Sequence, residues 1–327
     1  MSNNNIRMPE RLKLDFNLNT PITSYNYTSF IGGVIFANNK MRYPYYLSNH
    51  VQLVSNDIFD VSCEDMLMFE DKNVFEDKKI NKNILGKEEI KEDIIKMLNK
   101  GYYASVTVDE YDIPNRIFFN KKSFYHDLLI LGYDLLENIF LTAGYDKTDH
   151  FNTMKCDIDI VIHSISKCLN EKKTKPHFHY FKCKENNLSF NIESVKSKLE
   201  KYISGVPLTK RKYHGEYGLN AYTELINKYM YACKNKIYWR KASFSMLCEH
   251  KKLMLERVKY INTNCCDIDN DMISQFEEIY QISKIVQISA LKYEMTKSEG
   301  NLMSIVDKIK EISEKEEKSI IKLLEAI

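Results

Sequence analysis

The chain of 327 residues has few of the residues that interrupt regular secondary structure, with only ten Gly and six Pro. This scarcity leaves little room for long disordered linkers and excludes a collagen-like or low-complexity protein. Hydrophobic residues make up 44% of the chain and charged residues 28%, as in ordinary globular proteins. The length favours two domains, each large enough to bury a core of its own.

An excess of either charge is also missing. The 47 basic residues nearly balance the 45 acidic ones, and the net charge is +2. A dedicated nucleic-acid binder would carry a strong positive field, so we expect no nucleic-acid partner. A charged partner would have to be recognised by a local surface.

Long apolar runs and secretion signals are absent from the sequence. No run approaches the roughly 20 apolar residues that cross a bilayer, and the opening segment MSNNNIRMPERLK is polar. The sequence therefore predicts a cytoplasmic protein without a membrane partner. The eight cysteines show no CxxC spacing and indicate reduced thiols, with no cofactor or metal expected. The adjacent Cys265 and Cys266 fit a loop between helices better than a metal site.

Hydrophobic periodicity predicts an α+β first half. Thr23 or Ser24 would cap a short helix whose inward face includes Phe30 and Val34. A second amphipathic helix is predicted over 90–100 and ends at Gly101. β-Branched and aromatic residues predict strands over 102–109, 126–134 and 139–145, the last two joined as a hairpin, and a further hairpin over 177–184 and 188–192.

The pattern changes beyond about residue 205. Apolar residues at helical spacing predict four helices, over 222–236, 244–261, 271–297 and 302–326. We therefore predict an α+β domain with an antiparallel sheet over 1–204 and an all-helical domain over 205–327. The long helices from Asp271 onward fit a bundle within one chain or a homodimer equally well.

The segment around His126 carries the most specific chemical pattern. A histidine that begins an apolar strand, with a second strand beside it, is how papain-like enzymes present their general base. Such enzymes place the nucleophile at the start of an earlier helix, where Ser24 stands here. Asp146, after the neighbouring strand, is the candidate to orient His126 if the hairpin register is shifted. The alternatives are a helix cap at Ser24 and a packed strand-end histidine at His126.

Other candidates have simpler interpretations. His177 and His179 share one strand face, but two imidazoles without a third ligand are more typical of a strand surface than of a metal site. Cys63 would be a poor nucleophile, because the adjacent Glu64 and Asp65 oppose thiolate formation. The basic and aromatic segment 228–241 fits a nucleic-acid surface, an amphipathic helix or a docking surface for an acidic carrier protein.

Several segments resemble a known family. The chain, to about residue 262, is similar to proteins of nonribosomal-peptide and polyketide gene clusters that are related to the N-terminal domain of butirosin biosynthesis protein H. The resemblance rests on SYNYTSFIGGVI, YPYYLSNHVQL, VTVDEYDIP, FYHDLLILGYD, YGLNAYTEL and EHKKLMLERVKYI. It implies a papain-like fold and transfer of an acyl group from a carrier-protein thioester, through an active-site cysteine, to an amine.

The family's site residues are only partly present in this chain. By the resemblance, His126 matches the family's histidine, Ser24 stands where the cysteine would be, and Ala143 or Gly144 stands where the acidic residue would be. Two hypotheses follow. One is an accessory acyltransferase that uses Ser24, His126 and Asp146, with an acyl or peptidyl carrier protein and a small amine as partners. The other is a catalytically degenerate papain-fold scaffold that binds a carrier protein or its product.

Overall fold

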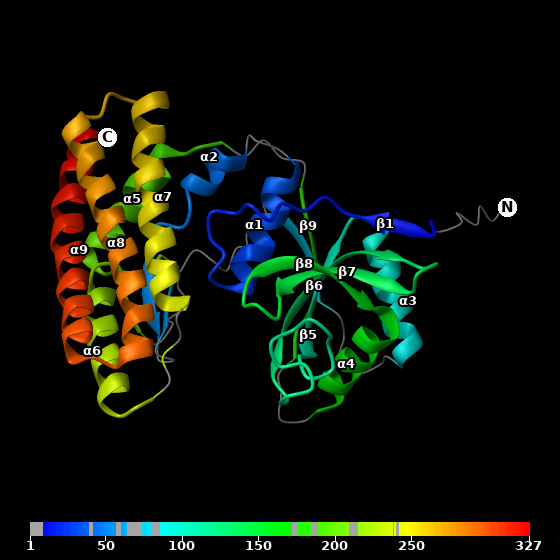
Figure 1. Cartoon of the computed structure of the whole chain (residues 1–327). Helices are drawn as coiled ribbons and strands as arrows, with labels where there is room; N and C mark the ends of the chain where they lie inside the picture. The colour runs from blue at the N-terminus through cyan, green and yellow to red at the C-terminus, as the bar shows by residue number, and fades with distance from the viewer. Residues whose placement is uncertain are drawn as a thin grey trace. The chain divides into compact units, whose positions relative to one another are not determined.

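The computed structural model describes residues 9–38, 42–56, 60–63, 74–79, 86–171, 176–184, 189–208, 215–237, 239 and 242–327. The chain forms two compact units (Figure 1). The first unit comprises Met1–Asn39 and Met68–Asn186, and the second comprises Lys40–Leu67 and Asn187–Ile327. This division differs from the predicted boundary at 204/205, because an early segment and the whole of 187–204 belong to the second unit.

A seven-stranded sheet organises the first unit. Its strands run in the order β4-β9-β5-β6-β7-β8, β1 pairs with β6, and every pairing is antiparallel. The strands are β1 (Arg11–Lys13), β4 (Phe75–Lys79), β5 (Tyr103–Asp109), β6 (Tyr125–Asp134), β7 (Ile139–Tyr145), β8 (Phe151–Asp157) and β9 (Phe178–Cys183). The prediction of a mixed domain with an antiparallel sheet is confirmed.

Three helices cover this sheet: α1 (Asn26–Asn38), α3 (Lys87–Leu98) and α4 (Ile158–Asn170). Side chains on one face of β5 and β6, such as Val106 and Ile130, join a buried core with α3 and α4. Successive side chains of a strand point to opposite faces, so the buried Tyr103 and Leu129 lie on the other face. Helix α1 packs against β6, β7 and β9 and lies across the sheet from α3 and α4 (Figure 1).

Most predicted elements of this unit are present. The helices near 30–35 and 90–100, strands β5, β6 and β7, and the hairpin turn over 135–138 are confirmed. Gly101 follows α3 with a φ of 79°, a left-handed conformation that suits glycine after a helix end. The predicted hairpin after β9 is wrong, because Asn191 caps a helix that begins at Ile192. Residues 185–188 lie outside the described part of the chain.

Helices dominate the second unit, as predicted. Its helices are α2 (Arg42–Leu47), α5 (Ile192–Ser204), α6 (Asn220–Lys234), α7 (Ala242–Asn264), α8 (Asn270–Thr296) and α9 (Glu299–Ala326). The last four match the four predicted segments. The unit also contains a small antiparallel sheet of β10 (Gly215–Tyr217), β2 (Leu53–Asn56) and β3 (Asp60–Cys63), so it is not purely helical.

A buried ion pair lies inside the helical unit. The ammonium of Lys251 on α7 is 2.6 and 2.7 Å from the two carboxylate oxygens of Glu316 on α9, and both side chains are fully buried. The hydroxyls of Tyr202 and Tyr222 donate to Glu316 Oε2, at 2.8 and 2.5 Å. A buried charge is costly unless it is paired and hydrogen-bonded, and these partners meet that requirement.

Two side chains of α7 hold the early segment 47–51 in this unit. Arg257 donates from Nε to the Leu47 carbonyl at 2.6 Å and from Nη2 to the Asn49 carbonyl at 2.7 Å. His250 Nε2 lies 2.8 Å from the carbonyl oxygen of Val51. These contacts join parts of the chain about 200 residues apart, which explains why the early segment belongs with the helices.

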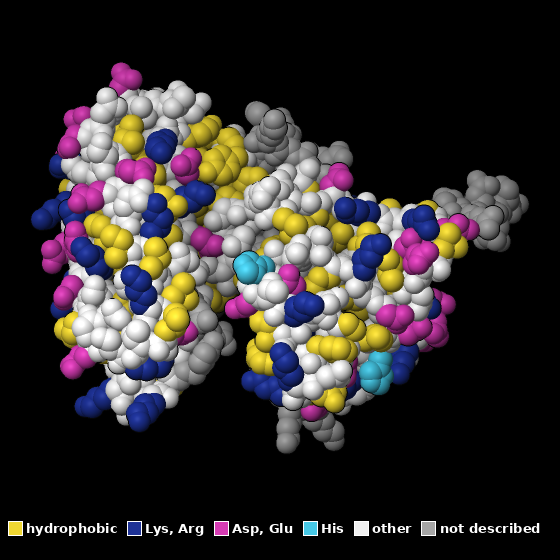
Figure 2. Space-filling view, in the orientation of Figure 1, with side chains coloured by type: hydrophobic (Ala, Val, Ile, Leu, Met, Phe, Trp, Pro, Cys, Tyr) yellow, Lys and Arg dark blue, Asp and Glu magenta, His cyan; other side chains and the backbone are white. Residues whose placement is uncertain are grey.

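The surface is mixed in character. On the face seen in Figure 2, basic and acidic side chains are interspersed over both units, as the near-zero net charge implies. Among the helices of the described residues, none has the length and apolar content required to span a bilayer.

Candidate functional site

Asp109, the last residue of β5, anchors the loop that carries part of the site. Its fully buried carboxylate accepts hydrogen bonds from the backbone amides of Tyr111 and Phe124 and from the hydroxyl of Ser123. Lys167 on α4 also donates to this carboxylate, at 2.8 Å. The loop over 110–124 is thereby pinned at both ends, which fixes Glu110 beside the start of β6.

Glu110 and His126 form the centre of the site. His126 pairs with Val108 in the β5–β6 register, so its side chain emerges next to the residue that follows β5. His126 Nδ1 lies 2.7 Å from Glu110 Oε1. The Glu110 side chain is only 4% exposed, whereas that of His126 is 33% exposed. One edge of the imidazole is therefore anchored in the protein, and part of the ring remains accessible.

Arg116 shares the same carboxylate. Its Nη2 donates to Glu110 Oε1, and its side chain is fully buried. Burial alone would raise the pKa of Glu110, but the hydrogen bond from His126 and the positive charge of Arg116 outweigh it and lower that pKa. Glu110 is therefore an ionised acceptor at neutral pH and holds two donors.

Asn26, the first residue of α1, meets the other ring nitrogen. Its Nδ2 is 3.0 Å from the Asp127 carbonyl and 3.2 Å from His126 Nε2. The Asp127 carbonyl can only accept, so it fixes the amide with Nδ2 on this side. With His126 Nε2 accepting from Asn26, Nδ1 carries the proton that is donated to Glu110. Arg116 Nη2 also lies 3.2 Å from Nδ1, but the hydrogen bond of this donor is directed to Glu110 Oε1. The buried Asn26 Oδ1 has no hydrogen-bond partner among the described residues.

Aromatic rings enclose the imidazole. The ring of Phe124 meets it edge-on, with centroids 5.4 Å apart, and the ring of Tyr145 lies parallel to it at 6.3 Å. The Tyr145 hydroxyl donates to the Thr23 carbonyl just before α1. These contacts join the start of α1 to β6 and β7, so the site is built on the sheet and helix of the first unit.

Comparison with known families gives no matching family model, and no curated protein matches the chain.

The predicted site residues are only partly brought together. His126 occupies the centre of the site. Ser24 lies two residues before α1 and is half-buried, and Asn26 is the residue of this segment that is hydrogen-bonded to His126 Nε2. Asp146 instead stabilises its own turn, where its Oδ1 accepts from the amide and the hydroxyl of Thr148 at 2.8 and 2.6 Å. Glu110 provides the carboxylate that was expected from Asp146.

The structure shows what occupies the space next to Gly144, one of the two positions where the resemblance would place an acidic residue. A Cβ atom placed on Gly144 would overlap Arg116 Nη1, closer than any real contact of this kind. The buried guanidinium therefore fills the space that a side chain at 144 would need. The sequence does place Glu110 directly after the predicted strand that precedes the His126 strand. Residue spacing alone, however, does not show that the Glu110 carboxylate meets His126.

A second histidine has a triad-like set of neighbours. His177 Nε2 lies 3.0 Å from the Ser105 hydroxyl, and His177 Nδ1 lies 3.2 Å from Asp127 Oδ1. Ser105, however, is only 3% exposed and lies mid-strand in β5, which pairs with β6 on one side and β9 on the other. A substrate carbonyl has no approach to such a hydroxyl. We interpret this cluster as a set of structural hydrogen bonds that connect the start of β9 to the neighbouring strands.

The other candidates are engaged elsewhere or lie outside the described part of the chain. His179 lies beside Asp77, with 3.3 Å between His179 Nε2 and Asp77 Oδ2, and the described residues contain no group of three His, Cys, Asp or Glu suited to a metal. Cys63 ends β3, and its side chain, like Glu64 and Asp65, lies outside the described residues. Cys265 and Cys266 lie in the loop between α7 and α8, as predicted.

The basic and aromatic segment belongs to the helical core. Tyr229 and Trp239 are buried and pack edge-to-face, with ring centroids 5.3 Å apart. Lys228 forms an ion pair with Glu224 at 3.0 Å, one helical turn earlier. This arrangement favours the amphipathic-helix interpretation, because the rings of Tyr229 and Trp239 are buried and not available for stacking on bases, whereas Tyr231 is exposed on the helix surface. Arg240 and Lys241 lie outside the described residues.

Proposed function

We propose that this chain is a papain-like scaffold protein of nonribosomal-peptide or polyketide biosynthesis, which binds an acyl or peptidyl carrier protein or its product without covalent catalysis. The observation that carries this proposal is the side chain of Asn26 at 3.2 Å from His126 Nε2. A papain-like enzyme needs a thiol or hydroxyl at that place, whose proton the histidine removes. A carboxamide nitrogen has no available lone pair with which to attack a thioester.

Several features support the papain-like part of the proposal. The first residue of α1 faces a histidine near the start of an antiparallel strand, and a buried acceptor holds the far nitrogen of that histidine. Papain-like enzymes also combine a helix start, a base and an orienting group, so this arrangement supports a papain-like site. The sequence resemblance to the family of butirosin biosynthesis protein H implies the same fold and a carrier protein as the partner.

The electrostatics of the site also favour binding over catalysis. A general base gains from an orienting carboxylate that stabilises the imidazolium as it forms. Here the charge of Glu110 is already compensated by the buried guanidinium of Arg116. The imidazolium would thus receive less stabilisation from Glu110 than from a carboxylate without a second partner. The partly exposed ring, enclosed by Phe124 and Tyr145, remains suited to contact a bound group.

An acyltransferase that uses Ser24 is the second candidate. One observation favours it: Glu110 orients His126 so that Nε2 points toward the segment that begins α1. In this mechanism His126 would take the Ser24 proton as Oγ attacks the thioester carbonyl, and the carrier thiol would leave with that proton. An amine would then attack the Ser24 ester to form an amide and restore the hydroxyl. Amides at the start of α1 would stabilise each oxyanion.

Intact-mass analysis with an acyl-loaded carrier protein from the same pathway separates the two candidates. The proposed scaffold binds the carrier in a pull-down or titration and shows neither an acyl adduct nor an amide product. An adduct on the wild-type chain that both Ser24→Ala and His126→Ala abolish would instead establish the acyltransferase. If the folded wild-type chain binds neither the carrier nor the acyl product and forms no adduct, both candidates are overturned.

A further inference from the structure

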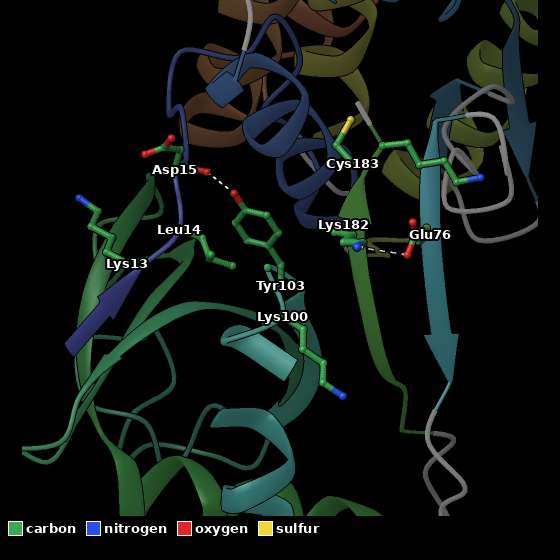
Figure 3. Close-up of a pocket in the computed structure, with 10 residues that line it drawn as sticks. Lys13, Leu14, Asp15, Glu76, Lys100, Tyr103, Lys182 and Cys183 are labelled. Carbon is green, nitrogen blue, oxygen red and sulfur yellow. Dashed lines mark hydrogen bonds and ion pairs between the residues drawn. The ribbon is translucent and has the colours of Figure 1, made fainter. Parts of the chain in front are cut away.

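A cavity of about 700 Å³ lies beside Tyr103 in the first unit (Figure 3). Lys182 in its wall is already paired with Glu76 at 3.3 Å, and Figure 3 shows the side chains of Lys13 and Lys100 directed away from Tyr103. These contacts suit a structural role, and we assign no ligand to the cavity. A stronger feature lies in the second unit, where a histidine is buried without hydrogen bonds from its ring.

His50 occupies an unfavourable position. Its backbone φ is 55°, in the left-handed region that few non-glycine residues adopt. The residue is only 1% exposed, and neither ring nitrogen has a hydrogen-bond partner among the described residues. Because most buried polar groups are paired, such an exception needs an explanation.

Cationic side chains hold the backbone on which His50 lies. Nη2 of Arg257 on α7 lies 3.3 Å from the His50 carbonyl oxygen, in addition to its bond to the Asn49 carbonyl. Lys198 on α5 donates to the Ser48 carbonyl at 2.8 Å and to Asn49 Oδ1 at 2.6 Å. These two positive charges stabilise the segment 47–51 while the His50 ring is neutral, and they would repel an imidazolium.

A second buried histidine lies on the same side of this segment. The ammonium of Lys251 is 3.0 Å from His250 Nδ1 and can only donate, so His250 Nε2 carries the proton donated to the Val51 carbonyl. His250 is therefore neutral and offers no negative charge to His50. The carboxylate of Glu316 is already paired with Lys251 inside the helical unit.

Two other neighbours bear on a charged His50. The ring of Tyr46 on α2 lies 4.1 Å from the imidazole, centroid to centroid, and would attract an imidazolium through a cation–π contact. Glu256, next to Arg257 along α7, is partly exposed and lies 3.8 Å from Lys259, so solvent screens its charge. The attraction of the Tyr46 ring is thus set against the loss of hydration and the repulsion of two cations.

Burial and these cations keep the His50 ring neutral. Burial is the largest cause, followed by the charges of Arg257 and Lys198, and together they lower the pKa of His50 to about 3. In a released segment the ring is hydrated, and its pKa returns to the ordinary value of about 6.5. Below that pH, protons bind the released form and not the bound one, so acid favours release increasingly down to about pH 3.

We propose that mild acid releases residues 47–51 from α7 through protonation of His50, which makes this contact between distant parts of the chain a pH-sensitive switch. Release would uncover Leu47 and Val51, which the bound form buries. Between pH 7.0 and 5.5, one such histidine increases the ratio of released to bound segment about tenfold. The switch lies in the second unit and does not depend on the proposed function.

Hydrogen exchange of the full chain, measured by mass spectrometry at pH 7.0 and 5.5, tests the proposal. The amides of Ser48 and Asn49 donate to carbonyls of α2, so release exposes them. After correction for intrinsic exchange at each pH, the wild-type 46–51 peptide should lose about tenfold more protection in acid than the same peptide of His50→Asn. Asparagine tolerates the left-handed backbone and does not titrate. His150→Asn removes an exposed histidine and should behave as the wild type.

Three outcomes would overturn the proposal: equal losses in the wild type and His50→Asn, an equal loss over α8, which would mean unfolding of the whole unit, or a gain of protection in acid, which would mean that Tyr46 holds the imidazolium. Circular dichroism at pH 7.0 confirms that the variants are folded. If His50→Asn is not, proton NMR of the wild type decides, since a His50 ring that titrates near pH 6.5 with the segment still protected contradicts the switch.

Discussion

Glu110 Oε1 accepts hydrogen bonds from two side chains at once, His126 Nδ1 at 2.7 Å and the guanidinium of the buried Arg116. This shared oxygen couples the histidine of the site to a charge pair inside the fold. The first prediction concerns stability. Glu110→Gln leaves the guanidinium without a counter-charge, and we expect the free energy of unfolding to fall by about 3 kcal/mol.

Urea denaturation of Glu110→Gln measures this loss. The matched control is Glu137→Gln in the exposed turn between β6 and β7, for which we expect a change within about 0.5 kcal/mol. Equal effects of the two substitutions would contradict a buried charge pair at Glu110.

The same pair predicts a pH dependence. The pKa of Glu110 in the folded chain lies below its ordinary value of about 4.3, so its contribution to stability is complete above that pH and is lost as the pH falls through the folded pKa. The stability difference between wild type and Glu110→Gln should therefore be constant near neutral pH and shrink below about pH 4. Urea titrations at several pH values measure it, and a difference that grows in acid would reverse the assigned sign.

Asn26→Cys should create a reactive thiol. The new sulfur would lie beside His126 Nε2 at the start of α1, where both the histidine and the helix dipole favour the thiolate. We expect alkylation by iodoacetamide, followed by peptide mass mapping, to be at least about tenfold faster at this introduced thiol than in the double variant with His126→Ala. Ser24→Cys is the informative comparison, since faster alkylation there would make Ser24 the position that corresponds to a nucleophile.

The tautomer of His126 gives a prediction that needs no activity. The hydrogen bonds place the proton on Nδ1 and leave Nε2 as an acceptor. Nitrogen-15 NMR of the imidazole should show this tautomer in the wild type and in Asp146→Asn, because Asp146 bonds within its own turn. Glu110→Gln should alter the His126 resonances. If Asp146→Asn alters the His126 resonances and Glu110→Gln does not, Asp146 is the residue that orients His126.

The ion pair of the helical unit predicts non-additive substitutions. Lys251→Met alone leaves the buried Glu316 without its counter-charge, and we expect the free energy of unfolding to fall by about 3–5 kcal/mol. Lys251→Met combined with Glu316→Leu removes both charges and should cost less than the single substitution. Thermal and urea denaturation of the full chain compare them. If the losses of Lys251→Met and Glu316→Leu simply add in the double variant, the pair does not act as a unit.

Much of the fold follows from local patterns, and the failures have local causes as well. The helices of the second unit are predictable because their apolar residues recur at helical spacing over many turns. Strand β8 gives no comparable signal, because Cys156 is the one buried residue of Phe151–Asp157 and the strand lacks a buried alternating face. Residue composition favours a strand after β9, whereas Asn191 accepts from the Ser194 amide and begins a helix.

The sequence predicts one residue of the site, His126, but not the residues that bond to it. His126 has a local signature, a histidine at the start of an apolar strand. Glu110 and Asn26 reach it from 16 and 100 residues away, through strand pairing and helix packing that no spacing rule encodes. Asp146 is the first carboxylate after the strand predicted to pair with the His126 strand, and sequence alone gives no means of knowing that its own turn engages it.

The contacts of Arg257 also have a consequence for synthesis. Leu47 emerges from the ribosome 210 residues before the arginine that holds its carbonyl. At about 5–20 residues per second, that interval lasts roughly 10 to 40 s. The strands of the first unit are all complete by Cys183, well before α7 is made. Residues 47–51 therefore lack their partners on α7 during this interval, a period in which a chaperone has access to Tyr46, Leu47 and Val51 that the finished protein buries.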